Sequence, residues 1–203
     1  AYEILRCLVG SEMCIRDSCW NRSRLGHGCN PHSTNRRIPA ILKKIQRVWS
    51  VWSMKKILFV CHGNICRSPM AEYVMKDLVK KAGLEAEFQI ASAATSREEI
   101  GNPVYPPAQR KLAEHGISCE GHAARQLCNR DYEEYDLLIG MDKANLHNMF
   151  RICGGDFNNK MHLLLEYAGR PDQEVADPWY TGDFDSTWQD VLEGCEGLLD
   201  NLM

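Results

Sequence analysis

Short apolar runs alternate with stretches of helical spacing from about residue 54 to the end of the chain. The first run, Ile57–Val60, is continuous and uncharged, as expected for a parallel strand that is covered on both faces. Similar runs at Phe88–Ala91, Asp136–Met141 and Met161–Leu165 predict three more strands. The pattern therefore predicts four short strands with other elements between them.

Apolar residues at helical spacing follow these runs. We expect helices from Ser68 to about Gly83, from Pro107 to His115, from Asp142 to about Cys153, and from Ser186 onwards. Ser68 is expected to cap the first helix, and Ser186 with Gln189 to form a capping box for the last. Cys195 on the inner face of the last helix is predicted to be a core residue. Strands alternating with helices predict a single doubly wound α/β domain.

The charge balance changes near Met54. Residues 1–53 carry nine Lys/Arg and three Asp/Glu, a balance of +6, whereas residues 54–203 carry 15 and 24, a balance of −9. The run Cys7–Ser18 resembles translated sequencing-adapter sequence. We expect residues 1–53 to be a non-native, disordered extension and residues 54–203 to be the folded domain. A transit-like peptide or a basic amphipathic segment at a membrane surface are the alternatives for 1–53.

Composition argues against several classes of protein. The chain is 44% apolar and 25% charged, as in soluble globular proteins, and lacks an uninterrupted apolar run of about 18 residues that would cross a membrane. An acidic domain disfavours a nucleic-acid partner. The seven histidines lack metal-ligand spacing, so no metal or other cofactor is expected. The ten cysteines lack zinc-site spacing and favour a reduced, cytoplasmic compartment.

The clearest chemical motif follows the first strand. Cys61 and Arg67 are separated by the five residues HGNIC, and a serine and a proline then open the next helix. A loop at a helix N-terminus binds phosphate through its free N–H groups and the helix dipole. Gly63 permits backbone conformations closed to other residues, so that successive N–H groups can point inward, and Asn64 tolerates the left-handed region. Arg67 offers a planar fork for two phosphate oxygens.

The same loop predicts covalent chemistry. Thiols near helix N-termini and guanidinium groups ionise at neutral pH, so Cys61 is suited to attack a bound phosphate and form a phosphocysteine. Ser68 can donate a hydrogen bond to it. Asp177, after the fourth strand, is the candidate proton donor because the carboxyl ends of parallel strands meet at one edge; a solvated turn aspartate is the alternative. The same spacing recurs from Cys119 to Arg125, but without a strand before it or a helix after it.

Four separated motifs occur in order between Met54 and Met203: CHGNICRSPMAE, HAARQL, YDLLIGMDKANL and DPWY. Together they resemble the low molecular weight protein tyrosine phosphatases. The resemblance implies a flavodoxin-like, four-stranded parallel sheet with helices on both faces. It implies hydrolysis of aryl phosphate monoesters in phosphotyrosine proteins or peptides, with inorganic phosphate as product. Cys61 would be the nucleophile, Arg67 the phosphate clamp, and Asp177 the general acid and later base.

The resemblance also assigns supporting residues. Those implied to bind phosphate or to brace the loop are His62, Gly63, Asn64, Ile65, Cys66, Ser68, Ser92 and His122. Cys66 matches a second loop cysteine that can form a reversible disulfide with Cys61, which makes the site redox-sensitive; simple loop packing is the alternative. Asp142 matches the family too, although its place as a helix cap already explains it.

Residues for the substrate cleft follow from the same comparison. Trp179 and Tyr180 come directly after Asp177 and can stack on a phenyl ring. Many family members place another aromatic residue where this sequence has Glu98, which leaves open how the ring is held and which flanking charge is preferred. An acidic rim would disfavour acidic peptides. We expect a monomer that has no membrane partner.

Three alternatives stay open. Arsenate reductases share this loop and fold but need further thiols downstream, and the third strand, DLLIGMD, carries none. Protein-arginine phosphatases of the same superfamily favour a hydroxyl-bearing residue where this loop has Ile65. A non-catalytic phosphotyrosine-binding module is the third alternative, although the nucleophile, the clamp and the acid are all present.

Overall fold

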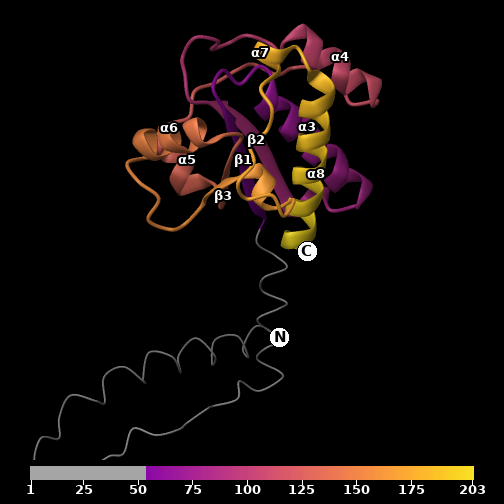
Figure 1. Cartoon of the computed structure of the whole chain (residues 1–203). Helices are drawn as coiled ribbons and strands as arrows, with labels where there is room; N and C mark the ends of the chain where they lie inside the picture. Colours follow the sequence, from indigo (N-terminus) through magenta and orange to yellow (C-terminus); the bar gives the residue numbers. More distant parts are fainter. Residues whose placement is uncertain (1–53) are drawn as a thin grey trace, which may run out of the picture. The chain divides into compact units, whose positions relative to one another are not determined.

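The computed structural model describes residues 54–203, which contain one four-stranded sheet (Figure 1). The strands are β1 (Lys55–Cys61), β2 (Phe88–Ala94), β3 (Leu137–Gly140) and β4 (Met161–Leu163). They are all parallel and lie in the order β2-β1-β3-β4. The predicted α/β fold with four parallel strands is confirmed. The prediction of a disordered extension at 1–53 lies outside the described residues.

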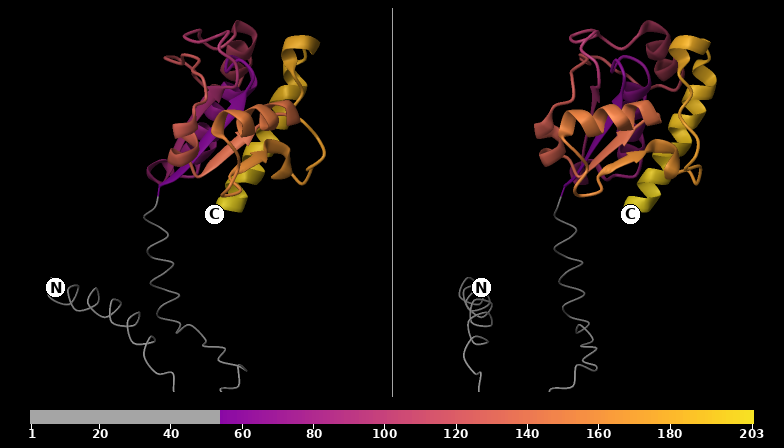
Figure 2. Two further views of the ribbon diagram at one scale, coloured as in Figure 1. Left: turned by 90° about the vertical axis from the view of Figure 1, so that its left-hand side faces the viewer. Right: turned by 60° about the vertical axis from the view of Figure 1, so that its left-hand side comes forward.

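Helices cover both faces of this sheet (Figures 1 and 2). One face carries α3 (Arg67–Lys81) and α8 (Phe184–Leu202), with α4 (Pro106–Glu114) packed beside them. The other face carries α5 (Asn129–Glu134) and α6 (Lys143–Cys153). The remaining helical turns are η1 (Glu85–Glu87), η2 (Leu164–Glu166) and the short α7 (Pro178–Thr181).

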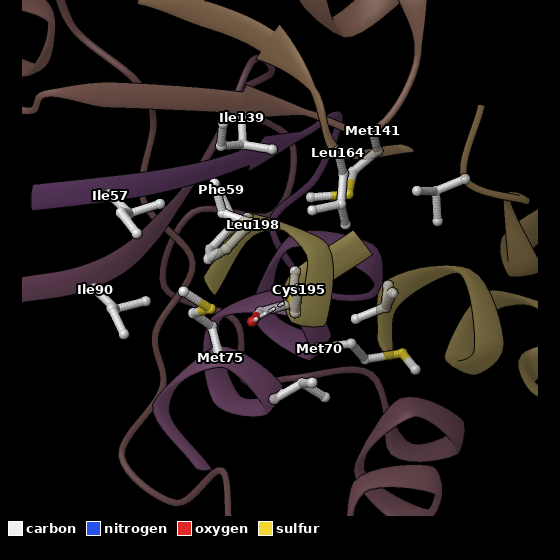
Figure 3. Close-up of a cluster of buried hydrophobic side chains, with 14 of the residues drawn as sticks. Ile57, Phe59, Met70, Met75, Ile90, Ile139, Met141, Leu164, Cys195 and Leu198 are labelled. Carbon is white, nitrogen blue, oxygen red and sulfur yellow. Dashed lines mark hydrogen bonds between the residues drawn. The ribbon is translucent and has the colours of Figure 1, made fainter. Parts of the chain in front are cut away.

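The apolar run of β1 is continuous because helices cover both of its faces. Ile57 and Phe59 belong to the core cluster on the α3 and α8 side, whereas Leu58 and Val60 belong to the cluster under α5 and α6. All four are fully buried, which stabilises the fold by about 1.5–3 kcal/mol for each side chain. Figure 3 shows Cys195 among the first cluster, where its thiol donates to the Ala71 carbonyl at 3.6 Å. The prediction that Cys195 is a core residue is confirmed.

Several predicted element boundaries are wrong. β2 continues three residues beyond Ala91, so Ser92 lies in a strand and not in the polar loop where it was expected. The third strand ends one residue before Met141, and the fourth ends at Leu163, where a 3-10 turn follows. α5 was not predicted, because its sequence NRDYEE is short and charged and carries no helical stripe.

Both predicted serine caps are wrong as well. α3 begins at Arg67 with Cys66 as its N-cap, so the Ser68 hydroxyl already lies inside the helix and is free for another partner. α8 begins at Phe184, and the Asp183 carboxylate accepts from the N–H of Ser186. In each case the serine lies inside the helix that it was expected to cap.

The sheet order reverses at β1, which lies between β2 and β3. In open α/β sheets, ligands bind outside the carboxyl ends of the strands at such a reversal. The loop of residues 62–66 leaves β1 at this point and leads directly into α3 (Figure 1). The fold therefore places this loop where a ligand is expected.

Candidate active site

The loop of residues 62–66 is held by backbone hydrogen bonds from the segment that follows β2. The N–H groups of Thr95, Ser96 and Tyr105 donate to carbonyl oxygens of Cys61 and of this loop at distances of 2.8–2.9 Å. These bonds occupy the carbonyl side of the loop. Its position is therefore fixed by a neighbouring segment as well as by β1 and α3.

Cys61 ends β1 with its side chain buried at the base of the loop. Its Sγ accepts the N–H of Asn64 at 3.3 Å and lies 3.0 Å from the Ser68 hydroxyl. A thiolate at this place has two hydrogen-bond donors. The Ser68 contact that the sequence suggested is present, and it accounts for a serine in the first turn of α3 that caps nothing.

Asn64 is the centre of the hydrogen bonds behind the loop. It is fully buried and has a φ of 59°, so it occupies the predicted left-handed region. Gly63 does not have a positive φ, so the loop does not use the backbone freedom that glycine permits there; a Cβ at Gly63 would instead lie 3.3 Å from Cγ of Glu99. Glycine thus lets the Glu99 side chain pack against the loop.

The Asn64 side chain connects three segments of the chain. Its Nδ2 donates to Ser68 Oγ at 2.9 Å and to Ser92 Oγ at 2.7 Å, and its Oδ1 accepts the N–H of Arg125 at 3.1 Å. Its own carbonyl accepts from His122 Nε2 at 2.8 Å. The structure thus brings Ser92 and His122 to the loop, from β2 and from the segment before α5.

Glu72 determines which groups donate and which accept in this set of hydrogen bonds. Its buried carboxylate accepts the Ser92 hydroxyl proton and also binds Lys76. Ser92 must therefore accept from Asn64, whose other amide proton goes to Ser68. The hydroxyl proton of Ser68 is then available to the Cys61 sulfur. The sequence reasoning missed Glu72, although a glutamate in the motif that opens α3 was a usable signal.

Arg67 is buried beside Cys61 and contacts two carboxylates. Nη1 donates to Asp142 Oδ2 at 2.8 Å, and Nη2 lies 2.6 Å from Asp177 Oδ2. Burial alone would lower the pKa of Arg67, but the negative charges at Cys61, Asp177 and Asp142 raise it above its usual value. The guanidinium is therefore a fixed positive charge at the base of the site.

Asp177 is the N-cap of the short helix α7. Its Oδ1 accepts the N–H of Trp179 at 3.1 Å, while its Oδ2 meets Arg67. Pro178 occupies the first helical position, where its fixed φ suits a helix start. The structure therefore brings Asp177 to the loop from 110 positions beyond Arg67, at the predicted edge of the sheet.

Cys66 lies at the far end of the loop, buried next to α3. Burial raises the pKa of its thiol to about 12, and negative charge at Cys61 acts in the same direction. Cys66 is therefore a neutral thiol at physiological pH. The two loop cysteines differ in their surroundings, since Cys61 has hydrogen-bond donors on its sulfur.

A cleft of about 190 Å³ opens above the loop. The lining residues that the sequence had already selected are His62, Gly63, Ile65, Cys66, Arg67, Glu98, Asp177, Trp179 and Tyr180. Glu99 also lines the cleft and was not predicted. The Trp179 ring lies 5.3 Å from that of Tyr105, a second residue that was missed, and this contact supports one wall of the cleft.

The second match to the cysteine–arginine spacing forms no such loop. The Arg125 guanidinium binds the buried Asp131 at 3.0 Å through both Nη atoms, and Cys119 lies elsewhere, in the lining of a different pocket. Only the backbone N–H of Arg125 reaches the site, where it holds Asn64.

Two features are absent from residues 54–203. In this range no three His, Cys, Asp or Glu side chains lie close enough together to hold a metal ion. Within the same range, no helix has the length and apolar character needed to cross a membrane.

Comparison with known proteins identifies the family. The family model described as "Low molecular weight phosphotyrosine protein phosphatase" matches residues 56–203. The Bacillus subtilis protein "Low molecular weight protein-tyrosine-phosphatase YfkJ" is 42% identical over 149 residues, covering 72% of this chain and 94% of that protein. A Gallus gallus "Low molecular weight phosphotyrosine protein phosphatase" is 37% identical over 151 residues, covering 72% and 95%.

Solved structures agree with the sequence comparison. The crystal structure of Bacillus subtilis YfkJ matches with a TM-score of 0.71 at 40% identity, covering 74% of this chain and 95% of that one. The structure titled "Crystal structure of DARP, drosophila arginine phosphatase" matches with a TM-score of 0.66 at 30% identity, covering 72% and 97%. The chain belongs to the low molecular weight phosphotyrosine protein phosphatase family.

Proposed function

We propose that this protein hydrolyses phosphotyrosine in proteins or peptides through a phosphocysteine intermediate on Cys61. One observation carries the proposal: the thiol and the guanidinium at the two ends of one loop meet a carboxylate from a distant segment of the chain. Arg67 and Asp177 both line the cleft and contact each other at 2.6 Å, and Cys61 is buried at the base of the same loop. These are the nucleophile, the anion-binding group and the proton donor that phosphoryl transfer from a phenol requires.

In the first step, the Cys61 thiolate attacks phosphorus and the bond to the phenolic oxygen breaks. Asp177 in its protonated form gives its proton to the departing oxygen, so tyrosine leaves as a neutral phenol. The Asn64 N–H and the Ser68 hydroxyl, both directed at Sγ, hold the thiolate in place before the attack. Arg67 and the loop N–H groups balance the negative charge on the phosphoryl oxygens.

In the second step, Asp177 is a carboxylate and takes a proton from water, which attacks the phosphocysteine. Inorganic phosphate leaves and the Cys61 thiolate is restored. In the free protein Asp177 contacts Arg67. A phosphate dianion in the loop competes for the same guanidinium, so substrate binding itself releases Asp177 to face the leaving group.

The test uses the full chain with p-nitrophenyl phosphate and phosphotyrosine peptides. Cys61→Ser abolishes turnover, while Cys128→Ser, a change at an exposed cysteine, leaves it unchanged. Asp177→Asn lowers kcat by roughly 10²–10⁴-fold, with the larger loss on the phosphotyrosine peptides, because tyrosine is a poorer leaving group than p-nitrophenol and depends more on protonation. Full turnover by Cys61→Ser would refute the mechanism.

Phosphoarginine is the second candidate substrate, because a structurally similar chain is titled an arginine phosphatase. The side chain at position 65 favours tyrosine. Ile65 lines the cleft and presents apolar surface, whereas arginine phosphatases of this superfamily favour a hydroxyl there. Comparing kcat/KM for phosphoarginine and phosphotyrosine separates the two candidates; a higher value for phosphoarginine would reverse the assignment.

Redox protection of the nucleophile belongs to the same proposal. A peroxide converts the Cys61 thiolate to a sulfenic acid, and the Cys66 thiol displaces water to form a disulfide that thiols can reduce. We also propose a reducing compartment such as the cytoplasm, in which the thiols of Cys61 and Cys66 stay available for this chemistry. We expect Cys66→Ser to lose activity irreversibly at peroxide doses from which the unaltered protein recovers with dithiothreitol. Equal recovery would contradict a role for Cys66.

A further inference from the structure

Two adjacent carboxylates stand at the cleft, on the segment that follows β2. Glu98 and Glu99 both line it, whereas the basic side chains among the lining residues are Arg67 and His62. Arg67 is committed to two aspartates, and His62 lies 3.2 Å from Glu98. The lining therefore has no basic side chain free of a carboxylate partner.

Glu99 is held in place at this rim. Its Oε2 accepts from Asn102 Nδ2 at 2.6 Å, and its methylene groups pack against Gly63 of the loop. A neutral amide holds the carboxylate without neutralising its charge. Glu99 is only partly exposed, so its charge is directed at the cleft and is not lost to free rotation in solvent.

Glu98 is more open to solvent and has only a weak partner. Its side chain is 74% exposed and that of His62 is 59% exposed, so the contact between them is worth little. The neighbouring Arg97 forms no ion pair with either glutamate in the described structure, and its Nε donates to Gln126 on the next segment. Both carboxylates are thus available to an incoming cation.

We propose that Glu98 and Glu99 form an acidic rim that selects phosphotyrosine peptides with Lys or Arg beside the phosphotyrosine. The phosphate binds in the loop, where Arg67 and the loop N–H groups balance its charge at the base of the cleft. Flanking residues stay at the mouth of the cleft and meet the two glutamates. The excess of acidic residues in 54–203, 24 against 15, adds long-range attraction for basic segments. This inference rests on the proposed phosphatase function.

The expected preference is moderate, because the rim is partly exposed. An exposed ion pair changes an equilibrium by up to about fivefold. Replacing Lys by Glu on both sides of the phosphotyrosine turns attraction into repulsion at two places, so we expect kcat/KM to differ by roughly tenfold at low salt. Salt at about 1 M shortens the Debye length to about 3 Å and should reduce the ratio to about twofold or less.

The test compares two peptides of one sequence, with either Lys or Glu at both positions flanking phosphotyrosine. The full chain should cleave the Lys peptide roughly tenfold faster in kcat/KM. The double variant Glu98→Gln, Glu99→Gln should bring this ratio below about threefold. Glu87→Gln is the matched control, since it removes the same charge at the end of η1, just before β2 and away from the loop edge, and should keep the full ratio. Because each ratio is taken within one enzyme preparation, partial unfolding of a variant does not affect it.

The outcomes separate the rim from the phosphatase function. A ratio near one in the unaltered chain, a ratio unchanged in the double variant, or one insensitive to salt would overturn the acidic rim. p-Nitrophenyl phosphate has no flanking residues and therefore reports the phosphatase alone. Turnover of this compound with no peptide preference would refute only the rim, whereas no turnover of any aryl phosphate would refute the proposed function.

Discussion

Gly197 provides a sharp test of the packing that holds the last helix against the domain. It lies inside α8, a helix of 19 residues, where glycine is an unfavourable choice. Helix propensity alone predicts that Gly197→Ala stabilises the protein by about 1 kcal/mol. The structure predicts the opposite sign, because α8 passes very close to the backbone after η2.

The size of the effect follows from two distances. A Cβ at position 197 would lie 2.1 Å from the Tyr167 carbonyl oxygen and 2.7 Å from its carbonyl carbon. An ordinary contact requires about 1 Å more, so one backbone must move away from the other. Overpacking of this kind costs about 1–3 kcal/mol, and the rigid backbone places it at the upper end. After the gain in propensity we expect a net loss of about 2 kcal/mol, roughly 4–8 °C in Tm.

Gly194 on the same helix supplies a comparison. A Cβ there would lie 2.5 Å from Cγ of Leu164, so the clash is with a side chain that can be shortened. Leu164→Ala should therefore make Gly194→Ala less costly, with a coupling energy of about 1 kcal/mol in a double-mutant cycle. The exposed neighbour change Glu196→Ala should move stability by less than about 0.5 kcal/mol. Urea denaturation of the full chain measures the four single variants and the double variant of the cycle; a rise in stability for Gly197→Ala would refute the close approach.

Three further predictions concern single side chains. Asp142→Ser should keep the cap of α6 but lose the contact to Arg67, so kcat should fall at least about tenfold while stability changes little. Asp142→Ala removes the cap as well, and its free energy of unfolding in urea should be lower by a further 0.5–2 kcal/mol or so. Burial raises the pKa of the Cys66 thiol to about 12, so the thiol stays protonated below that pH. In the folded protein at pH 8, Cys66 should resist iodoacetamide while the exposed Cys128 is labelled, and mass spectrometry of the peptides distinguishes the two. Hydrogen bonds from backbone N–H groups and Tyr132 lower the pKa of Asp156, although burial opposes the shift. The ionised Asp156 therefore stabilises the folded protein above a pH of about 4, and this contribution is lost as pH falls through the lower pKa of the folded state. Asp156→Asn should be less stable than the unaltered protein at pH 7, and the difference in unfolding free energy should shrink near pH 3.

The strands could be predicted because their apolar runs reflect burial on both faces. Ile57–Val60 and Asp136–Met141 coincide with β1 and β3 to within three residues at each end. β2 was cut short because Ser92 reads as the start of a polar loop. Its hydroxyl is buried but satisfied by Asn64 and Glu72, and no local pattern in the sequence reveals partners that lie elsewhere in the chain.

The helix starts show a second limit of local patterns. Ser68 and Ser186 each precede a run of helical spacing, which favours a cap. In both helices the backbone begins to turn earlier, because Asp183 offers a carboxylate in one case and the loop after Cys61 leads directly into α3 in the other. The sequence pattern therefore does not distinguish a serine inside the first turn of a helix from a serine that caps it. At Ser68 the difference matters for chemistry, since an inner serine can reach the Cys61 sulfur.

Asp142 shows why an ordinary structural explanation does not exclude a functional one. The local sequence predicts a helix cap, and Oδ1 does accept the N–H of Asn145 at 2.6 Å. A carboxylate has a second oxygen, however, and Oδ2 binds Arg67, which lies 75 positions earlier. The cap fixes the carboxylate, and the fixed carboxylate orients the guanidinium with no further loss of side-chain entropy. A capping carboxylate at the carboxyl end of a parallel strand can therefore also belong to a functional site, because strand order decides which distant cation it meets.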